Sequence, residues 1–298
     1  MAARHRANTD GYRLRMTHHR PDSASKMDGG VAGESIGVVV PTLNSARFLA
    51  DTLSSIRRVP QVSQVVVADS GSTDGTVEIA LAAGVEVLRD APAGLYPALN
   101  AACRTIGTPW LTYINADDLL QSAGIARLFA ERDRHDVLYG PVDFITADGA
   151  FIHCWHSARP RDVLPLFRAG VSPVLQQGTL IRRSLFVSLG GFQERWQLVA
   201  DADLWWRAAE AGARFHRITQ PPVASFRMHP SQLSQVNRIR MRDEYEAMAA
   251  GHGPRSTPVA SMWALTRYRA ARWQSYLVRI LRQGDLSGAC RPKPSYDY

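Results

Sequence analysis

The fold class is decided by Trp110-Leu111-Thr112-Tyr113-Ile114-Asn115-Ala116-Asp117-Asp118. Its apolar beginning is typical of a strand that is buried on both faces. Such a strand delivers the two adjacent carboxylates to the carboxyl edge of a sheet, where open α/β folds bind ligands. Neighbouring side chains of an extended segment point to opposite sides. One carboxylate can therefore take a divalent metal while the other reaches a neighbouring hydroxyl group.

The same residues also fit a purely structural role, the capping of a helix. Asp118 and Gln121 have the spacing of a reciprocal helix N-cap, and residues 124–131 could be the helix that they cap. The local sequence leaves both interpretations open. Features elsewhere in the chain favour the ligand-binding one.

Segments of strand and helix character alternate upstream of this stretch. The β-branched run 36–40 predicts a buried strand, and 47–57 has the apolar spacing of a helix. Strands at 64–68, 85–88 and 110–114 follow, separated by helices that end at 83 and span 95–105. This order predicts an α/β fold, a three-layer αβα sandwich with a mostly parallel central sheet.

The alternation weakens downstream. We expect strands at 137–145 and 151–155, joined by a turn at Asp148-Gly149. Further helices are expected at 160–168, 183–189 and 203–211, and a closing strand at 223–228. The chain is predicted to divide into a disordered basic tail (1–34), a catalytic domain (35–236, with halves 35–120 and 121–236) and a helical basic extension (237–298).

Composition restricts the function classes. The chain has 298 residues, 45% of them apolar, and can bury a full core. The formal net charge of +8 favours an acidic partner, such as a nucleotide diphosphate, an anionic lipid or nucleic acid. The three cysteines are widely spaced, so a reducing compartment is expected. Neither a long apolar run nor a secretory signal is found, which predicts a cytoplasmic protein.

Several motifs occur in a fixed order along the chain. They are Val38-Val39-Val40-Pro41-Thr42-Leu43-Asn44, Val67-Ala68-Asp69-Ser70-Gly71-Ser72-Thr73-Asp74-Gly75-Thr76, Gly94-Leu95-Tyr96, Asn115-Ala116-Asp117-Asp118, Gly190-Gly191-Phe192, Ala200-Asp201-Ala202-Asp203 and Phe226-Arg227-Met228-His229-Pro230. The ordered set resembles the family 2 inverting glycosyltransferases, of the bacterial type that builds surface polysaccharides. The resemblance covers residues 36 to about 235.

The resemblance implies a GT-A-like fold and transfer of a sugar from a nucleotide-diphosphate sugar to a glycan or lipid-linked acceptor. Pro41 and Thr42 match the loop along the nucleotide base, and Asp69 matches the acidic residue that bonds the base or ribose. Gly94 and Asn115 are assigned to donor binding in the same way. Asp74 is interpreted as a turn and helix cap only.

The resemblance also implies a divalent metal, Mn²⁺ or Mg²⁺, which suits hard carboxylate oxygens. Asp118 is assigned to the metal and Asp117 to the ribose or a shared metal contact, although the two could be exchanged. His229 matches a histidine that completes the metal shell in some relatives; an exposed loop histidine is the alternative.

Asp201 matches the general base that removes the proton of the acceptor hydroxyl. The alternative is that Asp201 caps a helix that begins near Asp203. Trp196 is a weaker candidate for stacking on an acceptor sugar. The chain departs from the family pattern at Pro97, at Gln193 and at Gln176-Gln177, so the sugar cannot be named.

The basic carboxyl-terminal region predicts one amphipathic helix. Its apolar arc would contain Met262, Trp263, Trp273, Leu277, Ile280 and Leu281. Packing on the enzyme's own domain is the commoner use of such a helix. Contact with the anionic inner face of the cell membrane is the alternative.

Two other function classes would require different sequence features. A nucleotidyltransferase on a similar sheet would carry a glycine-rich basic loop after its first strand, and residues 41–44 do not supply one. A nucleic-acid-binding protein would gather its arginines on one face or in a binding motif. Here they are spread until the last 60 or so residues, so no nucleic-acid partner is expected.

Overall fold

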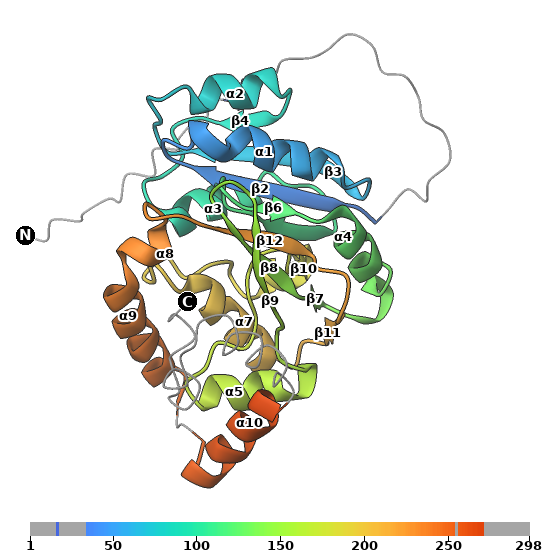
Figure 1. The fold of residues 1–298 in the computed structure, drawn as a ribbon, viewed down its shortest axis with the longest axis vertical. Helices are drawn as coiled ribbons and strands as arrows, with labels where there is room; N and C mark the ends of the chain where they lie inside the picture. Colours follow the sequence, from blue (N-terminus) through green and yellow to red (C-terminus); the bar gives the residue numbers. More distant parts are fainter. Residues whose placement is uncertain (1–15, 18–33, 254–255, 271–298) are drawn as a thin grey trace, which may run out of the picture.

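A mixed eight-stranded sheet forms the centre of the protein (Figure 1). The computed structural model describes residues 16–17, 34–253 and 256–270. The strand order is β1-β4-β3-β2-β5-β10-β7-β11. Its first half is built from β1 (Met16–Thr17), β2 (Ile36–Thr42), α1 (Ala46–Arg57), β3 (Val62–Asp69), α2 (Thr76–Ala82), β4 (Glu86–Leu88), α3 (Leu95–Cys103) and β5 (Trp110–Tyr113).

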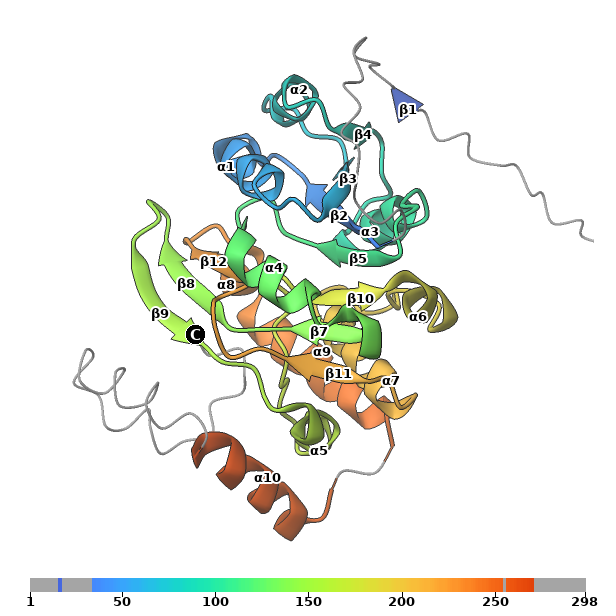
Figure 2. The ribbon, with the colours of Figure 1, turned by 90° about the vertical axis from the view of Figure 1, so that its right-hand side faces the viewer.

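Strand β2 explains why this half has three layers. It pairs in parallel with both β3 and β5, and its residues 36–40 are all buried. Val38 and Val40 pack in the core beneath α1, whereas Val39 packs in the core beneath α3. The period of two along a strand divides these side chains between two faces. Figure 2 shows the two helices on opposite sides of the strands, as the sequence predicts.

The tail and the edge of the sheet differ from the prediction. Residues 16–17 form β1, which pairs antiparallel with β4. Residue 34 is described as well, and residues 1–15 and 18–33 of the predicted disordered tail lie outside the described residues.

The second half adds a smaller sheet, of order β6-β12-β8-β9. Strands β10 and β7 continue the large sheet in antiparallel fashion, and β11 pairs in parallel with β7. The elements are β6 (Leu119–Leu120), α4 (Ser122–Phe129), β7 (Val137–Tyr139), β8 (Val142–Thr146), β9 (Phe151–Trp155), α5 (Val163–Arg168), β10 (Leu180–Arg182), α6 (Arg183–Ser188), α7 (Ala200–Glu210), β11 (Phe215–Arg217) and β12 (Ala224–Met228).

The prediction of one strand over 137–145 was wrong. The segment is divided at Gly140-Pro141 into β7 and β8, which belong to different sheets. Pro141 has no amide hydrogen for a ladder. A Cβ atom on Gly140 would lie 2.5 Å from Val223 Cγ1. Close packing of residue 223 against the bend therefore requires glycine at that position.

Three helices follow β12, namely α8 (Leu233–Val236), α9 (Arg238–Gly251) and α10 (Pro258–Ala270). Helix α10 packs through Ala264 and Tyr268 against a core cluster that contains Leu166 of α5. Met262 and Trp263 are 59% and 63% exposed. The predicted apolar arc is thus not the packed face of this helix, and its members beyond Ala270 lie outside the described residues.

Candidate active site

One cavity of about 710 Å³ collects the ends of elements from both halves of the chain. Its size is in the range of small-molecule sites. Of the residues predicted to bind ligand, those that line it are Pro41, Thr42, Gly94, Asn115, Asp117, Asp201 and His229. Asp69 and Asp118 are not part of its lining.

Asp117 and His229 face each other in this cavity. His229 Nε2 lies 2.8 Å from Asp117 Oδ2, and His229 Nδ1 lies 3.0 Å from the hydroxyl of Ser231. The histidine ring also packs on Phe48, with 5.1 Å between ring centroids. His229 is therefore held in place from two sides and is not an exposed loop histidine.

Asp118 is turned away from the cavity and is fully buried. Its carboxylate accepts hydrogen bonds from the backbone N–H of Arg227 at 2.9 Å and from the amides of Asn115 and Gln177 at 3.2 and 3.3 Å. Burial raises the pKa of Asp118, and the charge of Asp117 raises it further. The structure thus gives Asp118 hydrogen bonds inside the protein and leaves Asp117 facing the cavity.

The capping interpretation of Asp118 was wrong. Helix α4 begins after Gln121, and no side chain caps it. The amide of Gln121 donates instead to the hydroxyl of Ser225 at 2.7 Å.

Arg227 holds the acidic loop in place, a role that the sequence reasoning missed. The side chain is buried and donates to the carbonyl oxygens of Asp117 at 2.9 Å and Ala147 at 2.7 Å. Its guanidinium lies 4.8 Å from the centroid of the Phe48 ring. The sequence does contain one indication of this role, because Arg227 stands two residues before His229 in the same motif. In that motif, only the histidine was predicted from the sequence to have a function.

Asp69 is likewise directed inward, at 2% exposure. Its carboxylate accepts hydrogen bonds from the Thr42 hydroxyl at 3.0 Å, from the backbone N–H groups of Gly71 and Ser72, and from the Ser72 hydroxyl. These contacts join the end of β2 to the loop after β3. In this structure Asp69 shapes the loop beside the cavity and does not face the cavity itself.

Asp74 has the capping role that was expected. Its carboxylate accepts the backbone N–H of Thr76 at 3.1 Å, at the start of α2, and that of Ala46 at 3.0 Å, at the start of α1. These bonds satisfy amide groups that helix termini leave unpaired. The hydrogen bond from the Thr76 hydroxyl, together with these backbone bonds, keeps the pKa of Asp74 below its ordinary value.

Asp201 stands in the first turn of α7, on the wall of the same cavity. Its Oδ1 accepts the hydroxyl of Tyr96 at 3.0 Å and the backbone N–H of Ala202 at 2.8 Å. Burial raises the pKa of the carboxyl group, although these hydrogen bonds oppose the rise. The helix begins at Ala200, so the alternative of a cap before Asp203 was wrong.

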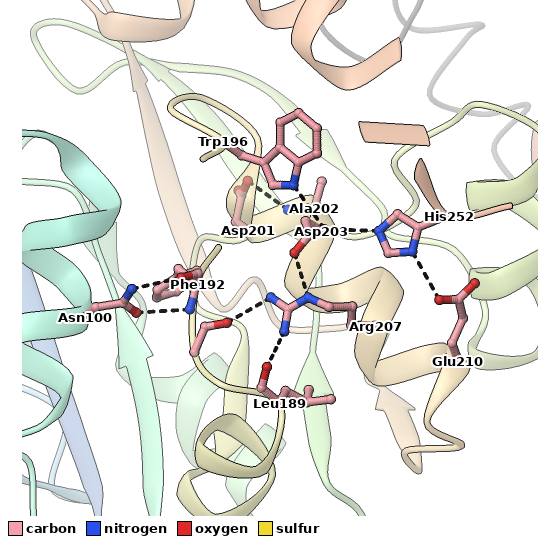
Figure 3. A network of polar contacts seen from close by, with 11 residues as sticks. Asn100, Leu189, Phe192, Trp196, Asp201, Ala202, Asp203, Arg207, Glu210 and His252 are labelled. Atoms are coloured by element: carbon pink, nitrogen blue, oxygen red, sulfur yellow. Dashed lines mark hydrogen bonds and ion pairs between the residues drawn. The ribbon is translucent and has the colours of Figure 1, made fainter. Parts of the chain in front are cut away.

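Asp203 has no access to the cavity and ties α7 to its surroundings (Figure 3). It accepts Arg207 Nε at 2.6 Å and the indole N–H of Trp196 at 3.3 Å. Arg207 in turn donates to the carbonyl oxygens of Leu189 and Gly191. Trp196 is therefore held by contacts within the protein and does not line the cavity, and Trp205 and Trp206 are both in the core.

Residues 37–186 match glycosyl transferase family 2. The chain belongs to this family. A PGL/p-HBAD biosynthesis glycosyltransferase of Mycobacterium bovis (strain BCG / Pasteur 1173P2) is 31% identical over 207 residues, which cover 66% of this chain and 78% of that protein. An uncharacterised glycosyltransferase of Mycobacterium tuberculosis (strain ATCC 25618 / H37Rv) is 28% identical over 168 residues, 52% of this chain and 76% of the relative.

Solved structures share the fold. A mannosyltransferase from Pyrobaculum calidifontis, in complex with GDP-Man and Mn²⁺, has a TM-score of 0.54 at 22% identity and covers 87% of this chain and 78% of its own. Glucosyl-3-phosphoglycerate synthase from Mycobacterium tuberculosis, with Mn²⁺ and UDP, has a TM-score of 0.50 at 19% identity and covers 79% and 86%. The protein is thus a glycosyltransferase with a GT-A fold, and neither rival function class is favoured.

Proposed function

We propose that this glycosyltransferase moves a sugar, with inversion, from a nucleoside diphosphate sugar to a hydroxyl of a glycan or lipid-linked acceptor. The observation that carries the proposal is that Asp201 and the Asp117–His229 pair line one cavity. An inverting transfer needs a base on one side of the sugar and stabilisation of the leaving diphosphate on the other. Residues 35–120 would supply most of the donor site, and α7 the acceptor side.

Asp201 is the proposed base. As the acceptor oxygen forms its bond to the anomeric carbon, the bond from that carbon to the diphosphate breaks and the hydroxyl proton passes to Asp201. A carboxylate with a raised pKa is a stronger base than an exposed one. The Tyr96 hydroxyl, 3.0 Å from Oδ1, fixes the orientation of the carboxylate.

The Asp117–His229 pair suits a divalent cation. Neighbouring ligands of an octahedral ion lie about 3 Å apart when each is about 2.1 Å from it, and the two protein atoms are 2.8 Å apart. Among the described residues, no group of three His, Cys, Asp or Glu could hold a metal. Phosphate and water oxygens would complete the shell, as is usual for such ions. The histidine nitrogen favours Mn²⁺ over Mg²⁺. A bound cation would neutralise charge on the departing diphosphate.

The assignments of Asp118 and Asp69 change in this proposal. Asp118 holds the acidic loop against β12 through Arg227, and Asp69 holds the loop at residues 71–72. Pro41, Thr42, Gly94 and Asn115 remain the proposed contacts of the donor. Gly94 has φ 105° at the entrance to α3, a conformation that favours glycine and lets the backbone approach a ligand closely.

An apolar rim supports an acceptor that carries a lipid. Leu43 and Leu233 line the cavity and are 59% and 51% exposed; Val236 and Ile239 follow on α8 and α9 at 68% and 72%. Exposed Val259, Met262 and Trp263 on α10 support peripheral contact with an anionic membrane. No helix among the described residues has the length and apolar character needed to span a membrane.

A thermal-shift screen tests the donor and metal. Nucleotide sugars of the uridine and guanosine series are added with Mn²⁺ or with chelator. A donor at 100 times its dissociation constant should add about 2.7 kcal/mol to the unfolding free energy, and chelator should remove most of it. Asp117→Asn should lose at least about half of the effect, and the control Asp133→Asn, whose side chain is 76% exposed, should keep it. Stabilisation that is insensitive to chelator would contradict the metal site.

Liposome flotation tests the membrane contact. The full chain is compared with a Met262→Ser, Trp263→Ser variant on vesicles that contain anionic lipid. Reduced flotation of the variant is expected because the two side chains supply exposed apolar area. Equal flotation of the two proteins would end this part of the proposal.

A further inference from the structure

Helix α9 contacts the segment that leads into α7. The Glu244 carboxylate accepts the backbone N–H groups of Gln197 and Leu198, the second at 3.1 Å. Arg240, one turn earlier, donates to the side-chain oxygen of Gln197. Leu198 lines the cavity and lies three residues before Asp201. This first contact therefore holds the chain just before the proposed base.

His252, directly after the carboxyl end of α9, contacts α7 itself (Figure 3). His252 lies with Nε2 3.0 Å from Asp203 Oδ1 and Nδ1 3.1 Å from Glu210 Oε2. Its ring stacks on Trp206 at 4.4 Å between centroids. A carboxylate only accepts, so both ring nitrogens must carry hydrogen for both bonds to form. The arrangement is that of a charged imidazolium between two acidic groups.

Asp203 connects His252 to other residues around α7. It is 1% exposed and also accepts Arg207 and Trp196. Two residues of α-helix rotate by about 200°, so Asp203 and Asp201 lie on opposite sides of α7. Asp203 and His252 therefore cannot touch a substrate in the cavity. They act by fixing the rotation and position of the helix that carries Asp201.

We infer that Glu244 and His252 are positioning residues for the base Asp201, and that α9 belongs to the catalytic unit. This inference rests on the proposed function. It moves the boundary of the catalytic unit beyond residue 236, where the sequence placed its end. The two contacts hold α7 before its first residue and along its buried side, and neither is made by the donor half.

Kinetics at saturating donor test the inference. With Mn²⁺ and a donor found by the screen, His252→Ala and Glu244→Ala should lower kcat at least about tenfold, since small displacements of a reacting group are costly. The affinity for the nucleoside diphosphate with Mn²⁺ should stay within twofold of wild type. His252→Gln and Glu244→Gln keep one polar contact each and should recover part of kcat. His135→Ala, which removes a histidine outside the cavity lining, should leave kcat unchanged.

The pH profile separates positioning from mere support of the fold. Burial opposes the charge on His252, but its bonds to Asp203 and Glu210, together with their negative charges, raise its pKa overall. Arg207 is the other charged group on Asp203. Wild-type kcat should therefore fall as pH rises through the raised pKa of His252, and His252→Ala should lack this decline.

Two results would overturn the inference. One is a lowered melting temperature with unchanged kcat and unchanged pH profile, which would make the contacts purely structural. The other is an equal loss of nucleotide affinity and turnover. Failure of the wild-type protein to bind any nucleotide would instead contradict the proposed function, and the inference with it.

Discussion

The acidic pair at the end of β5 and the acidic pair at the start of α7 differ in spacing but share one arrangement. In the first pair, Asp117 lines the cavity and Asp118 is buried in protein hydrogen bonds. In the second, Asp201 lines the cavity and Asp203 is buried against Arg207 and His252. Each pair therefore has one carboxylate toward the ligand site and one toward the protein.

The physical cause of the division differs between the two pairs. Asp117 lies in a turn between β5 and β6, closed by a hydrogen bond from the Asp118 N–H to the Asn115 carbonyl oxygen at 3.1 Å, and the change of backbone direction there separates Asp117 from Asp118. In a helix, residues two apart differ by about 200°, which separates Asp201 from Asp203. In both acidic pairs of this protein, only one of the two carboxylates faces the cavity. The local backbone conformation decides which one.

The largest effect is expected at the second pair. Asp201→Asn should lower kcat by about 10²–10⁴-fold, the range for loss of a general base, with donor binding intact. Because burial raises the pKa of Asp201, its charge costs stability near neutral pH, and the variant should be no less stable than wild type. Wild-type activity should rise with pH through this raised pKa. Steady-state kinetics and thermal melts check both statements, and near-normal turnover would remove Asp201 from the mechanism.

Its buried partner should show the opposite behaviour. Asp203→Asn should lower the unfolding free energy by about 3 kcal/mol, because removing one member of a buried ion pair strands the other. Arg207, at 2.6 Å, loses its charged partner. Denaturant unfolding measures the loss. An exposed carboxylate gives the control, and Asp133→Asn should change stability by less than about 0.5 kcal/mol. Equal unfolding free energies of Asp203→Asn and Asp133→Asn would contradict the structural role of Asp203.

The first pair should divide in the same way with smaller effects. Asp117→Asn should weaken Mn²⁺-dependent nucleotide binding by about 10–100-fold with an unchanged melting temperature. Asp118→Asn should lose about 1–3 kcal/mol of stability. Its new amide would meet donor groups of Asn115, Gln177 and Arg227, and an amide cannot accept from all of them. Isothermal titration and melting curves measure the two effects. Weaker nucleotide binding by Asp118→Asn, together with normal binding by Asp117→Asn, would instead assign the metal to Asp118.

The smallest effect concerns pH. The raised pKa of His252 adds stability that is fully present below the unfolded value of about 6.5 and is lost as pH rises through the folded value. Wild type should therefore exceed His252→Gln in stability by more at pH 6 than at pH 9, with a change below about 1 kcal/mol. Urea unfolding at both pH values measures it. A gap that widens with pH would contradict the assigned charge of His252.

Much of the first half could be predicted from the sequence. Runs such as 36–40 and 110–114 show that a strand is covered on both faces, and residues 47–57 have the apolar spacing of a helix. Local chemistry also fixed the capping role of Asp74, whose partners Thr76 and Ala46 stand at helix starts. The ordered motifs were sufficient to identify the family. All of them except Gly190-Gly191-Phe192, which follows α6, stand at the end of a strand or the start of a helix.

The division of 137–145 into two strands and the position of His229 could not be predicted from local sequence patterns. Pro141 was visible, but its effect depends on Val223, which packs on Gly140 from far along the chain. The partner of His229, at a separation of 112 residues, is likewise set by the pairing of β12 with β6 and β8.

The sequence by itself determined which residue types stand at strand ends and helix starts, because hydrophobic periodicity and turn chemistry are local properties. Only the tertiary structure decided that Asp117 and not Asp118 faces the cavity, that Arg227 and His229 meet the acidic loop, and that α9 holds α7. Contacts between distant segments depend on how the sheets and helices pack together. The hydrophobic periodicity of each segment carries no information about that packing.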